Sequence, residues 1–360
     1  MPTSIIAGVR NLSIGTDIQH YVITNFSAAL TYNNLYQYLA FIHTIKTNYV
    51  GTVNHTEIGY SILTYSVSRL SSNVHWLLFA LQFATVLFIY VSLVRYSREH
   101  KISIVFGMFV YYMLFYGQSL NLMRQTLAAS IVLFAVSYLI ENKFLLGTIL
   151  IFFAAQFHTS AYVALIFVYI LWRWNKKTVD IEHDFLYKKF GVLIILYLCM
   201  LLIGPYIFKL LQIIITYLPV FNKYTPSFAV STSEGYRYFG TTLFVISDLI
   251  VIGIYSSNKH SDPIEASKIT RLFYLTMVFS TGLYAMYRFQ TVIPRLAIYF
   301  SIFRIPAYSY FIEIEDNPFA SQLMRGLVIL VLIYLFVHNL LSGNGAIYPY
   351  ASQIIEQLWG

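Results

Sequence analysis

Apolar runs of about 20 residues, long enough to cross a membrane as helices, are the feature that most limits what this chain can fold into. Of its 360 residues, 58% are hydrophobic and 11% are charged. Soluble domains carry about 25% charged residues, so a water-exposed surface cannot be assembled here and lipid must cover most of the protein. The sequence predicts an all-α, polytopic integral membrane protein with about ten transmembrane segments.

The expected spans lie near 73–94, 102–122, 124–141, 190–210, 239–255, 272–288, 295–312 and 324–341. A longer apolar stretch, 144–172, contains a polar run centred on His158. Inside a membrane, the N–H and C=O groups of irregular backbone must form hydrogen bonds with protein or water. We therefore expect two short helices that meet at His158. The Tyr-rich segment 18–45 is predicted to be an amphipathic helix on the membrane surface, with a loosely packed loop as the alternative.

Lys and Arg residues gather in three loops that alternating spans place on one side of the membrane. Short basic loops are typical of the cytoplasmic side. Residues 1–72 and 342–360 then lie outside, on either side of a transmembrane domain at 73–341. No signal carries 1–72 outward, so we expect a further span before Met1. The net charge of +8 belongs to loops between spans, and we expect no nucleic-acid partner.

Arginines are favoured among the basic residues of the outer side, and Arg124, Arg237 and Arg295 stand where inward-running helices begin. A cation is disfavoured at a helix N-terminus, whereas guanidinium and backbone amides together suit a phosphate. We predict an outer pyrophosphate site, for a lipid-linked pyrophosphate, from Arg10, Arg124, Arg237, Arg288 and Arg295. The alternative is that each arginine separately reaches lipid phosphate.

The candidate general bases for a sugar hydroxyl are Asp17, Glu57 and His158, because all three lie on the predicted outer side. Asp17 and Glu57 could instead pair with an arginine, and His158 could be structural. Asp248 and Arg304 fall inside spans, and we expect Asp248 in a buried hydrogen bond.

Several chemistries lack their sequence signatures. The chain has no P-loop, no GxGxxG after a strand, no HExxH, no GxSxG and no cysteine pair, since Cys199 is its one cysteine. We therefore expect neither a metal nor a cofactor. Tyrosines could stack on sugars, although a membrane-interface belt explains most of them equally well.

Six segments appear in the order RNLSIGTDIQHY (10–21), EIGYSILT (57–64), NLMRQTLAASI (121–131), FHTSA (157–161), PRLAIYF (294–300) and YPY (348–350). In this order they resemble the EpsG family of bacterial exopolysaccharide polymerases, which are relatives of the Wzy-type O-antigen polymerases. The candidates for support or sugar binding are Tyr21, Tyr60, Asn121, Gln125, Ser160 and Tyr299.

The resemblance implies that undecaprenyl-pyrophosphate-linked repeat units are joined on the outer face of the plasma membrane, for capsule, exopolysaccharide or O-antigen. Arg10, Arg124 and Arg295 would hold the donor or acceptor pyrophosphate. Besides these lipid-linked oligosaccharides and membrane lipid, a flippase and a chain-length regulator are the expected partners.

Two other classes stay open as alternatives. A flippase for lipid-linked oligosaccharide would need charges along a path through the bilayer and an inverted repeat, whereas the ionisable residues here gather at one face. An O-antigen ligase or a membrane acyltransferase would share the architecture. An acyltransferase would need a reactive cytoplasmic histidine, and His100, His183 and His260 lie in polar, charged loops.

Overall fold

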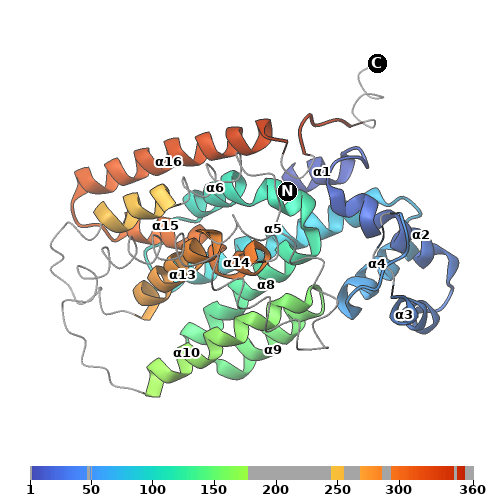
Figure 1. Cartoon of the computed structure of the whole chain (residues 1–360). Coiled ribbons are helices and arrows are strands. Elements are labelled where there is room, and N and C mark those ends of the chain that lie inside the picture. The colour runs from blue at the N-terminus through green and yellow to red at the C-terminus, as the bar shows by residue number, and fades with distance from the viewer. Residues whose placement is uncertain are drawn as a thin grey trace, which may run out of the picture. The chain divides into compact units, whose positions relative to one another are not determined.

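A computed structural model describes residues 2–46, 49, 51–176, 245–254, 268–285, 293–343 and 347–352. Within these ranges every regular element is a helix (Figure 1). The chain divides into two compact units. The first comprises Met1–Arg95, Tyr111–Ile170 and Asn339–Gly360, and the second comprises Tyr96–Val110 and Leu171–His338.

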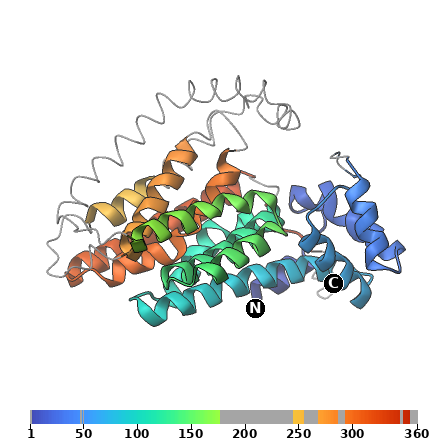
Figure 2. The same cartoon turned by 90° about the horizontal axis from the view of Figure 1, so that it is seen from below.

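The N-terminal part of the first unit is a set of short helices. These are α1 (Pro2–Val9), a π-helical turn η1 (Ile18–Val22), α2 (Ile23–Thr31), α3 (Leu35–Thr44) and α4 (Ile58–Leu70). Helices α2 and α3 pack on α4, around a small core that includes Tyr38 (Figure 2). The Tyr-rich segment 18–45, where amphipathic helices were expected, is helical but divided into η1, α2 and α3. Tyr32 is extended, and Asn34 starts a new helix because its side chain accepts the Tyr36 amide at 2.7 Å.

The rest of the first unit is built around α8 (Met123–Ile140), whose side chains are almost all buried. It packs against α9 (Phe144–Ala155) and against the 3₁₀ helix η2 (Thr159–Ala164), which continues into α10 (Leu165–Lys176). The long helix α5 (His75–Glu99) precedes them in the chain. The predicted break at His158 is confirmed, since α9 ends at Ala155 and η2 begins directly after His158.

The predicted span at 102–122 is helical but interrupted at Phe115, between α6 (Ile104–Leu114) and a separate short helix, α7 (Tyr116–Asn121). Polar side chains favour this break. The Ser119 hydroxyl lies 2.6 Å from the Tyr116 carbonyl and 3.0 Å from Gln82 Oε1. A serine bonded to a carbonyl of its own helix can bend that helix, while the Phe115 and Ser119 amides still donate to the Tyr111 and Phe115 carbonyls.

The second unit contains the helix Val245–Ile254, α13 (Lys268–Ala285), α14 (Ile293–Ser301), α15 (Arg304–Glu313) and most of α16 (Pro318–Leu341). The predicted span at 295–312 is helical but interrupted between Ser301 and Arg304, where α14 ends and α15 begins. The cause is Pro306, whose ring would collide with the Ile302 carbonyl in a continuous helix. The predicted span 190–210 lies outside the described residues.

The break between α14 and α15 places Arg304 beside Asp248, and both side chains are sealed from solvent. Arg304 donates two hydrogen bonds to the carboxylate, at 3.0 Å from Nε and 2.6 Å from Nη2. Thr281 and Tyr308 each donate a hydroxyl to the same carboxylate at 2.6 Å. The predicted hydrogen-bonded role of Asp248 is confirmed. A buried ion pair of this kind needs such extra donors to offset its desolvation.

In the described part of the chain, three helices are long and apolar enough to cross a membrane: α5, α8 and α16. The shorter apolar helices are α6, α9 and Val245–Ile254. Helix α16 begins with Asn317, whose side chain accepts the amides of Phe319 and Ala320, followed by Pro318 at the first helical position. These helices agree with the predicted helical membrane protein.

Candidate functional site

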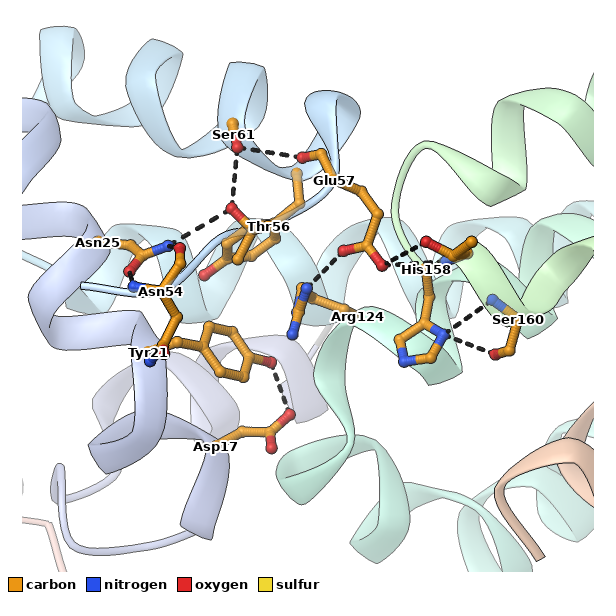
Figure 3. Close-up of polar contacts among 12 residues, drawn as sticks. Asp17, Tyr21, Asn25, Asn54, Thr56, Glu57, Ser61, Arg124, His158 and Ser160 are labelled. Carbon is orange, nitrogen blue, oxygen red and sulfur yellow. Dashed lines mark hydrogen bonds and ion pairs between the residues drawn. The ribbon is translucent and has the colours of Figure 1, made fainter. Parts of the chain in front are cut away.

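Arg124, the second residue of α8, is the centre of a polar cluster in the first unit (Figure 3). Its guanidinium carbon lies 4.2 Å from the ring centre of Tyr21 and 5.4 Å from that of Tyr60. The two tyrosine rings meet edge to face at 5.6 Å. Cation–π contacts within about 6 Å are attractive, so the rings hold the guanidinium in one orientation.

Glu57, directly before α4, binds this guanidinium and a second donor pair. Its Oε2 accepts from Arg124 Nη1 at 2.5 Å, and its Oε1 accepts from the Thr159 amide and hydroxyl at 3.0 and 3.1 Å (Figure 3). Burial alone would raise the pKa of the Glu57 carboxyl. The Arg124 charge, then His158 and the Thr159 amide, outweigh burial and lower that pKa below its ordinary value. Glu57 is therefore an ionised carboxylate at neutral pH.

Asp17 lies on the other side of Tyr21. The Tyr21 hydroxyl donates to Asp17 Oδ2 at 2.6 Å (Figure 3). Burial, and then the Asp17 charge, raise the pKa of Tyr21 well above its ordinary value. The Asp17 loop is fixed to the end of α7, because the Thr16 amide and hydroxyl donate to Asn121 Oδ1 at 2.8 and 2.7 Å. The contact brings this loop to the start of α8.

Arg10 is buried next to the start of α8, with 1% of its surface exposed. Its Nη2 contacts Met123 Sδ at 3.0 Å, while Nε and Nη1 have no hydrogen-bond partner among the described residues. Burial lowers the pKa of this guanidinium to about 10, so it stays charged at neutral pH. Sulfur is a weak acceptor, and the described residues therefore leave this cation without the anionic acceptor that burial usually demands.

The C-terminal segment 347–352 holds both neighbours of Arg10. The Asn11 amide donates to the Ala351 carbonyl at 2.8 Å, and the Ser352 hydroxyl donates to the Val9 carbonyl at 2.5 Å. Tyr350 donates its hydroxyl to the Ile6 carbonyl at 2.6 Å. Residues 350–352 thus bind the segment 6–11 that contains Arg10.

His158 caps η2 and lies beside Glu57 (Figure 3). Its Nδ1 lies 2.6 Å from Ser160 Oγ and 3.4 Å from the Ser160 amide. In the tautomer in which Nδ1 accepts from both groups, Nε2 carries the proton and is a hydrogen-bond donor.

The structure brings Asp17, Tyr21, Glu57, Tyr60, Arg124 and His158 into one cluster, with Arg10, Asn121 and Ser160 in contact with its members or their neighbours. Gln125 is buried within α8. Tyr299 is buried in α14 of the second unit. The backbone of Arg295 belongs to α14, while its side chain, Arg237 and Arg288 lie outside the described residues.

Thr159 was missing from the predicted site, although it supplies two of the donors to Glu57. The sequence indicated only a helix start at this position, where a threonine ordinarily caps its own helix. Here His158 is the cap, and Thr159 is left to bind the carboxylate of another helix. The signal was present in the motif FHTSA, but its partner lies 102 positions earlier in the sequence.

Comparison with known proteins identifies the family of this chain. The sequence model of the EpsG family matches residues 1–352, a range that contains each of the segments on which the resemblance was based. Searches against curated proteins and against solved structures found no significant match. The family match covers almost the whole chain and includes both Arg10 and Arg124. This chain belongs to the EpsG family, a family linked to exopolysaccharide biosynthesis.

Proposed function

We propose that this protein is a polysaccharide polymerase that joins lipid-pyrophosphate-linked oligosaccharide repeat units at the outer face of the bacterial plasma membrane. The carrying observation is the pair Arg10 and Arg124. Arg10 contacts Met123, the residue before Arg124, and both guanidinium groups interact electrostatically with Asp17 and Tyr21, so the two cations belong to one cluster. Two cations in one cluster suit a diphosphate.

The burial of Arg10 supports an anionic ligand. A desolvated guanidinium without an anion costs several kcal/mol, roughly the penalty of burying one uncompensated ion. The described residues supply only a thioether to its donors. An oxygen of a substrate diphosphate would complete the hydrogen bonding and neutralise the charge, so the energy stored in the empty site would be recovered on binding.

The chemistry follows from the same arrangement. A hydroxyl oxygen of the acceptor unit bonds to the anomeric carbon of the donor glycan while the bond from that carbon to the diphosphate oxygen breaks. The electron pair of the broken bond goes to the lipid diphosphate, which the arginines stabilise. The hydroxyl proton passes to Asp17, Glu57 or His158, the proton acceptors of the cluster.

Two kinds of partner follow from this function. A flippase must deliver the lipid-linked units to the outer face, and a regulator can set the length of the polymer.

The test is chain extension by purified protein in detergent, with a lipid-pyrophosphate-linked repeat unit as the sole substrate. The expected result is a ladder of products with the natural sequence and a loss of about 100-fold in rate with Arg124→Ala or Arg10→Ala. Arg325→Ala is the matched control, because Arg325 on α16 forms a partly exposed ion pair with Glu313 at the end of α15. Normal product lengths with Arg124→Ala, at equal protein level, would refute the proposed site.

A further inference from the structure

The donors around the Glu57 carboxylate form an anion site. One oxygen is bound by a guanidinium nitrogen of Arg124, and the other by the amide and hydroxyl of Thr159. Phosphate oxygens accept hydrogen bonds from the same donor groups, and a phosphate carries more charge and more acceptor oxygens than a carboxylate. The site is already occupied by a side chain of the protein itself.

We propose that Glu57 is an internal substitute for substrate phosphate: in the empty protein it occupies the anion position on Arg124 and Thr159, and the substrate must displace it. This inference rests on the proposed function, because the displacing anion is the substrate diphosphate. It goes beyond that function in stating which side chain must leave the site before the substrate binds.

The exposure of the ion pair distinguishes it from a structural one. The side chains of Arg124 and Glu57 are each 17% exposed, whereas those of Arg304 and Asp248 are 0% and 1% exposed. The Arg124–Glu57 pair is therefore partly open to solvent, whereas the Arg304–Asp248 pair is sealed. Arg304 and its partners are closed into a packed core, but Thr159, which binds Glu57, is itself exposed.

Neighbouring groups keep Arg124 in place when its carboxylate partner leaves. The Tyr21 ring lies 4.2 Å from the guanidinium carbon and does not depend on Glu57. A phosphate can thus replace the carboxylate without a movement of α8.

Displacement also changes the chemistry of Glu57. The Arg124 charge is the largest of the influences that lower the pKa of this carboxyl. Once Arg124 binds phosphate, the carboxylate loses this stabilisation and becomes a better proton acceptor. Substrate binding would then make Glu57 a stronger base at the same time as it transfers the Arg124 guanidinium from Glu57 to the phosphate.

The experiment measures the binding of inorganic pyrophosphate to the purified protein by titration calorimetry. Glu57→Gln removes the competing charge, so pyrophosphate should bind about tenfold more tightly than to the natural sequence, the equivalent of one charge-assisted hydrogen bond. Glu57→Asp keeps the charge on a shorter side chain and should give an intermediate affinity. Arg124→Ala should bind more weakly than the natural sequence.

The outcomes separate the two proposals. If the natural sequence binds pyrophosphate, Arg124→Ala does not, and neither Glu57 variant binds more tightly, then Glu57 does not compete and the internal substitute is refuted while the anion site remains. If neither the natural sequence nor any variant binds pyrophosphate, the anion site of the proposed function fails as well. Glu57→Asp keeps the test decisive if Glu57→Gln does not fold.

Discussion

Gly59 and Gln156 approach so closely that a Cβ atom on Gly59 would stand 2.8 Å from both the Cβ and the carbonyl oxygen of Gln156. The Tyr60 amide donates to that same carbonyl at 3.1 Å. This contact seats the start of α4 on the loop before η2, and so places Glu57 within reach of Thr159. The glycine is needed for the site rather than for the conformation of α4.

Gly59→Ala should therefore reduce polymer synthesis by about tenfold or more, because a shift of about 1 Å at a catalytic group is costly. The control is Gly326→Ala in α16, where an added Cβ has nothing within 4 Å. Chain extension by the two purified variants checks the prediction. Equal activity in both would show that the approach of α4 to Gln156 is unimportant.

Arg124→Lys should lose most of the activity, although it keeps the positive charge. Lysine cannot donate in a fork, and it would lose the planar contact with the Tyr21 ring. We expect at least about a tenfold fall in extension rate, the equivalent of one charge-assisted hydrogen bond. Rates near those of the natural sequence would mean that a point charge is sufficient.

Arg10→Met should make the empty protein more stable and its anion binding weaker. The buried guanidinium lacks an acceptor for two of its nitrogens in the described structure, and methionine fills similar space without a charge. Removing the unsatisfied donors should stabilise the fold by about 1–3 kcal/mol. Thermal unfolding with and without pyrophosphate measures both effects. A lower midpoint in the absence of pyrophosphate would contradict the assignment of Arg10 to ligand binding.

Asp248→Asn should destabilise the protein by about 3–5 kcal/mol, because it leaves Arg304 buried without its counter-charge. The binding of pyrophosphate should not change, since the hydrogen bonds of Asp248 in the described part of the chain go to Thr281, Arg304 and Tyr308 of the second unit. Unfolding measurements give the stability of the variant, and calorimetric titration of the same sample gives its affinity for pyrophosphate. A weakened pyrophosphate affinity in a folded variant would show that this pair acts on the site.

The contribution of Glu57 to stability should depend on pH in the direction set by its lowered pKa. The pair with Arg124 stabilises the fold above the ordinary carboxyl pKa of about 4.5, and this stability is lost as the pH falls through the lower pKa of the folded state. The natural sequence should thus be more stable than Glu57→Gln at pH 7, and the difference should vanish in acid. Unfolding midpoints across this range test it, and a constant difference would rule out an ionised pair.

The helical membrane architecture was readable from the sequence because apolar length and sparse charge leave few alternatives. The break at His158 was also predictable, since a polar run inside an apolar stretch cannot continue a buried helix. The breaks at Phe115 and after Ser301 were not predicted. The helix breaks at Phe115 although the apolar sequence pattern continues through this residue. Apolar residues also surround Pro306, so the hydropathy pattern gave no sign of the second break.

The site was predictable by residue type but not by contact. Arg124 was identified from its place at the start of a span, and Glu57 and His158 from their chemistry. The pairing of Glu57 with both Arg124 and Thr159 joins three segments, and no local pattern encodes a contact between segments so far apart. Arg10 was expected near phosphate, but its burial beneath the C-terminal segment depends on the tertiary fold.

The bond between Asn11 and Ala351 has a consequence for biosynthesis. A ribosome delivers Arg10 before the helices α2 to α16 and Ala351 after them, so the cation remains unenclosed until residues 347–352 have been made. A prematurely terminated polypeptide would lack the closing segment. Molecules that end before this segment should consequently leave the Arg10 guanidinium open to solvent, where its free donors can bind water.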